Sequence, residues 1–168
     1  SQTIASHLLP DWLLELRRAE SGRGQPPTEA RLRTENSDAV ISLVRTGELD
    51  LGFIETPVQP RGPGTATVRH DNMVFAVSAD HPWAGQDGVD LEEVSDIPLV
   101  TREEGSGTRA AFETAVESAL GRAAAAPLVV LGTEAAVRTA VAHGVAPAVL
   151  SELTIRDDVR LGRIRALR

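Results

Sequence analysis

The chain has no cysteine and few aromatic residues, and both absences narrow its function. Without cysteine it forms no disulfide and offers no thiolate to a metal. Aromatic residues make up 3% of the 168 residues, too few to favour a large planar ligand. No two histidines have the i,i+4 spacing of a helical metal site, since the four lie far apart, at His7, His70, His81 and His143. We therefore expect no metal ion and no cofactor.

Lysine is absent as well, and all 17 basic residues are arginine. A nucleotide-binding P-loop needs Gly-Lys-Ser/Thr and is therefore excluded. The net charge of −7 argues against binding of a phosphate backbone by this chain, since such binding needs a basic face. No apolar run approaches the ~20 residues of a membrane span, and no secretory signal opens the chain, as would also be true of an excised fragment. We expect no membrane contact.

Apolar runs and helical patterns alternate along the chain, which predicts an α/β fold with parallel strands, in one domain or two small lobes. The predicted strands cover residues 30–34, 51–54, 73–78, 99–101, 128–131 and 148–150. The predicted helices cover residues 4–18, 36–46, 91–94, 109–120 and 134–143. Thr3 is expected to cap the first helix, and Pro10 to kink or divide it. Residues 56–64 are expected to form a loop and residues 81–83 a turn.

The segment Arg-Glu-Glu-Gly-Ser-Gly-Thr-Arg at residues 102–109 follows a predicted strand and leads directly into a predicted helix. Such a turn directs backbone N–H groups, hydroxyls and the positive end of a helix dipole toward one point. It predicts an anion cradle, and no acidic residue is expected to fill it. Arg109 opposes the helix dipole, so anion binding and a surface ion pair are given equal weight for it. Glu104 stands where a nucleophile elbow needs glycine, and no acid/base pair is found, so no enzyme is expected.

Polar residues recur where predicted strands end and helices begin. In a parallel sheet these positions meet at the ligand crevice, so the residues should converge although they are far apart in sequence. Taken singly, a Ser, Thr or Asn at a helix start is most often only a cap. The residues expected to bind the ligand are Ser1, Thr3, Asn36, Ser37, Thr101, Ser106, Gly107, Thr108, Arg109 and Thr133.

Several short motifs, in this order, resemble the effector-binding domain of LysR-type transcriptional regulators. Ser-Gln-Thr-Ile-Ala-Ser-His-Leu-Leu-Pro at residues 1–10 is similar to the family's opening motif. Further matches are Glu-Asn-Ser-Asp-Ala-Val (35–40), Thr-Gly-Glu-Leu-Asp-Leu-Gly (46–52), His-Pro (81–82) and Val-Ala-His-Gly (141–144). One departure is Ala146, which replaces the second glycine of the family's Gly-x-Gly.

The resemblance implies a type 2 periplasmic-binding-protein fold. This fold has two Rossmann-like lobes joined by a two-stranded hinge, with the ligand cleft between them, and the chain is expected to be truncated at both ends. Lobe one is expected to cover residues 1–75 and to regain residues 154–168, and lobe two to cover residues 76–153. The hinge crossovers are expected near residues 76–78 and 150–153.

The resemblance also implies the biological role and the partners. These are a small anionic effector in the cleft, a homodimer or tetramer, a cytoplasmic location, and DNA binding only through an N-terminal helix-turn-helix domain that this chain does not contain. A periplasmic or extracellular solute-binding protein of the same fold remains the alternative.

Overall fold

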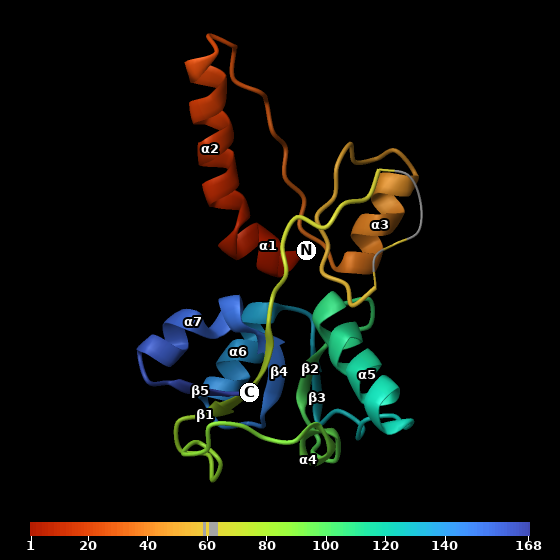
Figure 1. Ribbon diagram of the computed structural model, residues 1–168, viewed down its shortest axis with the longest axis vertical. Coiled ribbons are helices and arrows are strands. Elements are labelled where there is room, and N and C mark those ends of the chain that lie inside the picture. Colours follow the sequence, from red (N-terminus) through yellow and green to blue (C-terminus); the bar gives the residue numbers. More distant parts are fainter. Residues whose placement is uncertain (59, 61–63) are drawn as a thin grey trace.

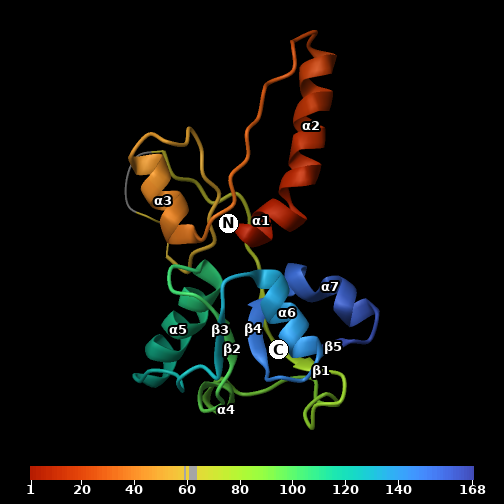
Figure 2. The same cartoon turned by 180° about the vertical axis from the view of Figure 1, so that it is seen from behind.

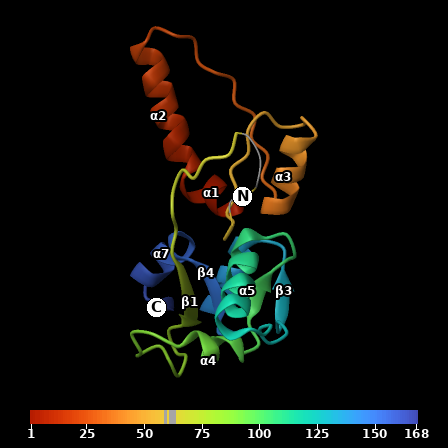
Figure 3. The same ribbon diagram turned by 45° about the vertical axis from the view of Figure 1, so that its right-hand side comes forward.

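The computed structural model describes residues 1–58, 60 and 64–168 and shows two bodies connected by an extended segment (Figure 1). The N-terminal body contains α1 (Gln2–His7), α2 (Leu9–Gly22) and α3 (Ser37–Arg45). The C-terminal body contains β1 (Met73–Ser78), α4 (Leu91–Ser95), β2 (Val100–Arg102), α5 (Gly107–Leu120), β3 (Val129–Leu131), α6 (Glu134–Ala142), β4 (Ala148–Ser151), α7 (Glu152–Arg160) and β5 (Ile164–Leu167). Residues 65–72 run from the N-terminal body directly into β1 (Figure 3).

The C-terminal body contains a three-stranded sheet and a two-stranded sheet, and the antiparallel pairing in the first corrects in part the prediction of parallel strands. β1 is the central strand of the order β4-β1-β5 and pairs antiparallel with both neighbours. β2 and β3 pair in parallel and lie beside β4, where Val100 N donates to Pro147 O at 2.9 Å. Strand direction differs because β1 enters from the N-terminal body and runs away from it, while β4 and β5 return. Apolar patterning sets which residues form strands but does not set their direction.

Helices cover both faces of this sheet, because the side chains of β1 alternate between two apolar clusters. Figure 2 shows α6 and α7 on one face of the sheet. The cluster under these two helices contains Val74, Ala76, Val100, Val137, Val141, Ala148, Leu150, Ile155 and Ile164. The other lies under α4 and α5 and contains Phe75, Val77, Val94, Leu99, Phe112, Val116 and Leu167. Two-sided burial makes this body a rigid support for the helix starts that face α1 and α3.

Local stop and start signals placed most elements of the C-terminal body within two residues of the prediction. Gly121 ends α5 in the left-handed conformation with φ of 67°, and the Thr133 side chain caps α6 by accepting a hydrogen bond from Ala136 N. Asn36 caps α3 in the same way, through Ala39 N. In the N-terminal body, the helix expected over residues 4–18 is divided at Leu8, and Ser1 rather than Thr3 takes the cap position of α1.

The strands predicted over residues 30–34 and 51–54 are not formed. Both segments are extended but pair with no strand among the described residues, and Leu32 and Leu51 are 61% and 69% exposed. The second segment instead packs on α3, where a Cβ on Gly52 would lie 2.6 Å from the Val40 side chain. A strand pattern alone is insufficient without a neighbouring strand to complete its hydrogen bonds. The loop expected over residues 56–64 lies partly outside the described residues.

The last part of the chain differs from the expected return of residues 154–168 to lobe one. β5 pairs with β1 over Phe75–Ser78, and Ile155 of α7 is fully buried in the C-terminal body. The first predicted hinge position, residues 76–78, lies in the central strand, where Ala76 pairs with both β4 and β5 and the next two residues pair with β5. The second, residues 150–153, covers the end of β4 and the start of α7. In the described chain, residues 65–72 make the crossing instead.

Candidate functional site

The start of α5 faces the start of α3 across the boundary between the two bodies. Asn36 Nδ2 donates to Glu104 O at 3.2 Å and to Glu103 Oε1 at 3.4 Å. Asp38 N donates to Gly105 O at 3.2 Å. Gly105 has φ of 82°, and a Cβ there would lie 3.1 Å from the Asn36 amide, so glycine suits both the turn and the contact. We call this contact, together with the α1 and α6 contact described below, the inter-body seam.

Glu55 lies in the seam between Ser37 and Gly107. Ser37 Oγ donates to Glu55 O at 2.9 Å and accepts from Glu55 N at 3.3 Å. A Cβ on Gly107 would lie only 1.9 Å from Glu55 O, so the backbone of residue 55 rests on the first turn of α5. Ser37 and Gly107 were predicted to lie at the ligand crevice, whereas Glu55 was not among the predicted residues.

A second contact of the seam joins α1 to the start of α6. Thr3 Oγ1 donates to Glu134 Oε2 at 2.6 Å, and His7 Nε2 lies 3.0 Å from Glu134 Oε1. Gln2 Oε1 accepts from Glu134 N at 2.9 Å. Glu134 therefore contacts three residues of α1, namely Gln2, Thr3 and His7. Thr3 and Glu134 are both buried. Thr133 itself is exposed and serves as the cap of α6.

The seam therefore contains the carboxyl groups of Glu55, Glu103 and Glu134, which corrects the expectation that no acidic residue occupies the cradle. Burial raises the pKa of the Glu55 carboxyl above its usual value, and repulsion from Glu134 adds to the rise. Interactions with Ser1 and Thr3 offset the rise only in part. The hydroxyl-bearing residues expected to receive an anion thus already surround a carboxyl of the chain itself.

The raised pKa of Glu55 gives a stability prediction for Glu55→Gln. Between the usual and the raised pKa, the folded chain binds more protons than the unfolded chain, so the free energy of unfolding falls as pH rises through this window. The glutamine variant does not lose stability in this way, because its side-chain amide does not ionise. It should match the wild type at a pH below the usual carboxyl pKa and exceed its stability above the window.

Urea unfolding of both chains at several pH values measures the effect. Glu15→Gln on the exposed face of α2 is the matched control for replacing a carboxylate by an amide. A Glu55→Gln chain that is less stable than the wild type at neutral pH would show that the ionised carboxylate is stabilised in the seam.

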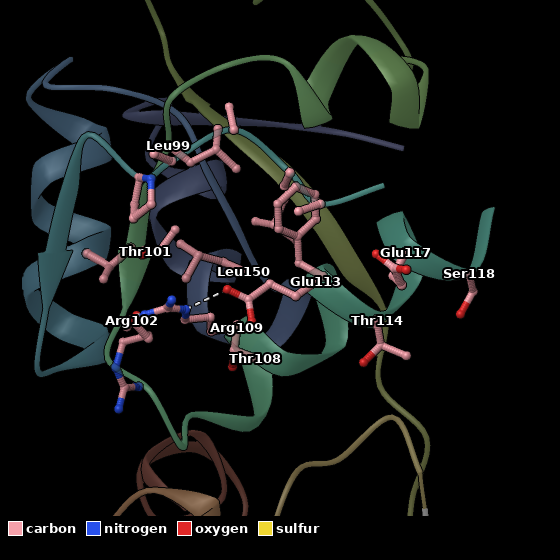
Figure 4. Close-up of a pocket in the computed structure, with 18 residues that line it drawn as sticks. Leu99, Thr101, Arg102, Thr108, Arg109, Glu113, Thr114, Glu117, Ser118 and Leu150 are labelled. Carbon is pink, nitrogen blue, oxygen red and sulfur yellow. Dashed lines mark hydrogen bonds and ion pairs between the residues drawn. The ribbon is translucent and has the colours of Figure 1, made fainter. Parts of the chain in front are cut away.

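The remaining predicted site residues divide between the seam and a cavity beside it. Ser106, 4% exposed, takes the cap position of α5, but its hydroxyl makes no cap hydrogen bond. Ser1 is half-buried, with its side chain beside the Glu55 carboxyl. In contrast, Thr101, Thr108 and Arg109 line a cavity between α5 and the sheet (Figure 4).

The Arg109 side chain lies away from the seam. Its Nε donates to Glu113 Oε1 at 2.7 Å and its Nη1 to Arg102 O at 3.4 Å. Of the two alternatives given equal weight for Arg109, the structure shows the ion pair. Arg102 is paired with Glu103 at 2.8 Å.

The described ranges contain no cluster of His, Cys, Asp or Glu suited to a metal ion. Nor do the helices in these ranges include one with the length and apolar character needed to cross a membrane.

Comparison with known proteins assigns the family. The LysR substrate binding domain matches residues 1–168. An uncharacterized HTH-type transcriptional regulator of Mycobacterium tuberculosis is 43% identical over 99% of this chain, and the chain spans only 54% of that protein.

Two solved structures share the fold. The CcmR regulatory domain of Synechocystis PCC6803, in complex with 2-PG, has a TM-score of 0.77 and 22% identity, over 99% of this chain and 76% of that one. The effector-binding domain of QuiR, in complex with shikimate, has a TM-score of 0.78 and 14% identity, over 98% of this chain and 75% of that one. The α/β architecture is therefore the type 2 periplasmic-binding-protein-like fold of these regulatory domains. The chain belongs to the LysR substrate-binding-domain family.

Proposed function

We propose that this chain senses a small anionic effector at the inter-body seam and regulates transcription as part of a LysR-type protein. The observation that carries the proposal is that the starts of α1, α3, α5 and α6 converge on the seam, although they are far apart in the sequence. The starts of α5 and α6 direct positive dipole ends to this boundary, and the first turn of α5 has no side-chain cap. The two bodies are then the lobes of the sensor, with residues 1–72 in one and 73–168 in the other.

Three further observations support a regulator over a solute receptor or an enzyme. The M. tuberculosis relative is an HTH-type regulator, so DNA binding is assigned to a helix-turn-helix segment outside these 168 residues. The net charge of −7 fits a domain that does not itself bind DNA. The structural neighbours hold 2-PG and shikimate. A cytoplasmic homodimer or tetramer is the corresponding assembly, and no step of this function requires catalysis.

The ligand residues proposed at the seam are Ser1, Thr3, Asn36, Ser37, Ser106 and Gly107. Ser106 is the most direct candidate because its hydroxyl is not used to cap α5. Thr133 is assigned to capping, and Thr101, Thr108 and Arg109 to the neighbouring cavity. An anion at the seam would lie close to the Glu55 carboxyl, so its binding should be tighter when that carboxyl is protonated.

Isothermal titration with 2-PG, shikimate, phosphate and sulfate tests the proposal. We expect at least one of these anions to bind, and Ser106→Ala to weaken its binding by about 1–2 kcal/mol, roughly 5- to 30-fold, since one hydrogen bond to a charged group is lost. Ser42→Ala, on the exposed face of α3, is the control and should leave the affinity unchanged. Equal affinities of the Ser106→Ala and wild-type chains would place the ligand elsewhere.

A further inference from the structure

The cavity between α5 and the sheet has a volume of about 530 Å³, within the range of small-molecule sites. Apolar wall comes from Leu99, directly before β2, and from Leu150 of β4 (Figure 4). Phe112 of α5 adds to it. Residues 123–127, which connect α5 to β3, complete the lining. None of the seam residues of α1 or α3 contributes, so the cavity belongs to the C-terminal body alone.

Both arginines that line this cavity are already in ion pairs. Arg102 and Arg109 line it together with Glu113 and Glu117. The Arg109 guanidinium is already paired with Glu113, and Arg102 with Glu103. An anionic ligand would therefore have to displace an existing ion pair to bind either arginine.

One polar group of the lining has no partner. Thr101 Oγ1 is buried and makes no hydrogen bond within the described chain. A buried hydroxyl without a partner is unfavourable, and its neighbours in the lining, such as Leu99 and Leu150, cannot satisfy it. A ligand oxygen beside Thr101 would do so.

We propose that this cavity is a second ligand site, which binds a small, uncharged, mainly apolar molecule carrying one hydroxyl or carbonyl oxygen. The apolar wall buries the hydrocarbon part, and the Thr101 hydroxyl bonds the oxygen. The site differs in location and in ligand chemistry from the seam, where an anion is proposed. Because α5 forms one side of the cavity and its first turn forms part of the seam, occupancy of either site should change affinity at the other by the same factor.

Fluorine NMR with 4-fluorophenol tests the site, with 4-fluorobenzoate as the charged probe of similar size. We expect saturable binding of 4-fluorophenol and at least tenfold weaker binding of 4-fluorobenzoate. Thr101→Val, which keeps the shape and removes the hydroxyl, should weaken 4-fluorophenol binding about three- to tenfold. Thr139→Val on the exposed face of α6 is the matched control and should change nothing.

Two more variants separate this site from the seam. Ala126→Phe, at an exposed position of the lining, should abolish 4-fluorophenol binding by filling space while leaving the fold intact. Ser106→Ala should leave 4-fluorophenol binding unchanged. The inference is overturned if 4-fluorophenol does not bind, if both probes bind equally, or if Ser106→Ala weakens 4-fluorophenol binding as much as Thr101→Val. The titrations with anions remain a separate measurement of the seam.

Discussion

Gly107→Ala is expected to open the inter-body seam and to weaken effector binding about tenfold or more. The added Cβ would lie 1.9 Å from Glu55 O and 2.8 Å from Ser37 Oγ, where carbon contacts normally need about 3.5 Å. The closest atom belongs to the backbone of Glu55, whose O accepts a hydrogen bond from Ser37 Oγ and whose N donates one to the same hydroxyl, so it cannot move aside easily. The two bodies must separate locally, and the first turn of α5 then no longer faces α3.

The same substitution should not harm α5 itself. Gly107 does not have a positive φ, and alanine favours a helix over glycine by about 0.5–1 kcal/mol. Loss of binding with unchanged or increased stability therefore distinguishes an open seam from misfolding. Titration with whichever of the four anions binds, together with small-angle scattering, measures both effects.

Gly22→Ala in α2 is the control, because a Cβ there meets nothing within 4 Å. It should leave both the affinity and the scattering profile unchanged. Wild-type affinity in the Gly107→Ala chain would mean that the ligand does not need this contact.

Ile155→Ala is expected to cost about 2–5 kcal/mol of unfolding free energy. Ile155 is fully buried, and its cluster includes Val74, Val137 and Leu150, from three different elements. Truncation leaves a cavity at the place where α7 packs on the sheet, and the surrounding strands cannot collapse to fill it.

Urea unfolding measures this cost. Leu161→Ala, at the exposed end of α7, is the matched control and should change stability by less than about 0.5 kcal/mol. A small effect of Ile155→Ala would instead fit the sequence-based expectation that residues 154–168 belong to the other lobe.

Elements whose limits are set by local chemistry could be predicted from the sequence, and those that depend on distant partners could not. Gly121 and Thr133 mark the end of α5 and the start of α6 within their own turns. The segment at residues 51–54 has strand-like residues but no neighbouring strand to pair with among the described residues. The direction of the strands could not be predicted from the sequence either, because the path of β1 depends on where the chain crosses between the bodies.

The same distinction applies to the site. Asn36 and Ser37 were found because helix starts carry recognisable polar residues. Glu55 and Glu134 were missed, since a glutamate in sequence gives no sign that tertiary packing will bury it. For Glu134 the position directly after the Thr133 cap was the available signal, as it marks the first residue of a helix facing the crevice. For Arg109, the Glu113 four residues later was the signal for the ion pair.

The central position of β1 has a mechanical consequence. Residues 65–72 connect the N-terminal body to the middle of the sheet, not to its edge. A pull along this segment is therefore shared by the hydrogen bonds to β4 and β5 together, which lie across the direction of force and resist it in shear. Such a load would displace the whole C-terminal body as a unit before it peeled off any strand. A movement of one body relative to the other is then transmitted to the whole sheet, and no strand has to unfold locally.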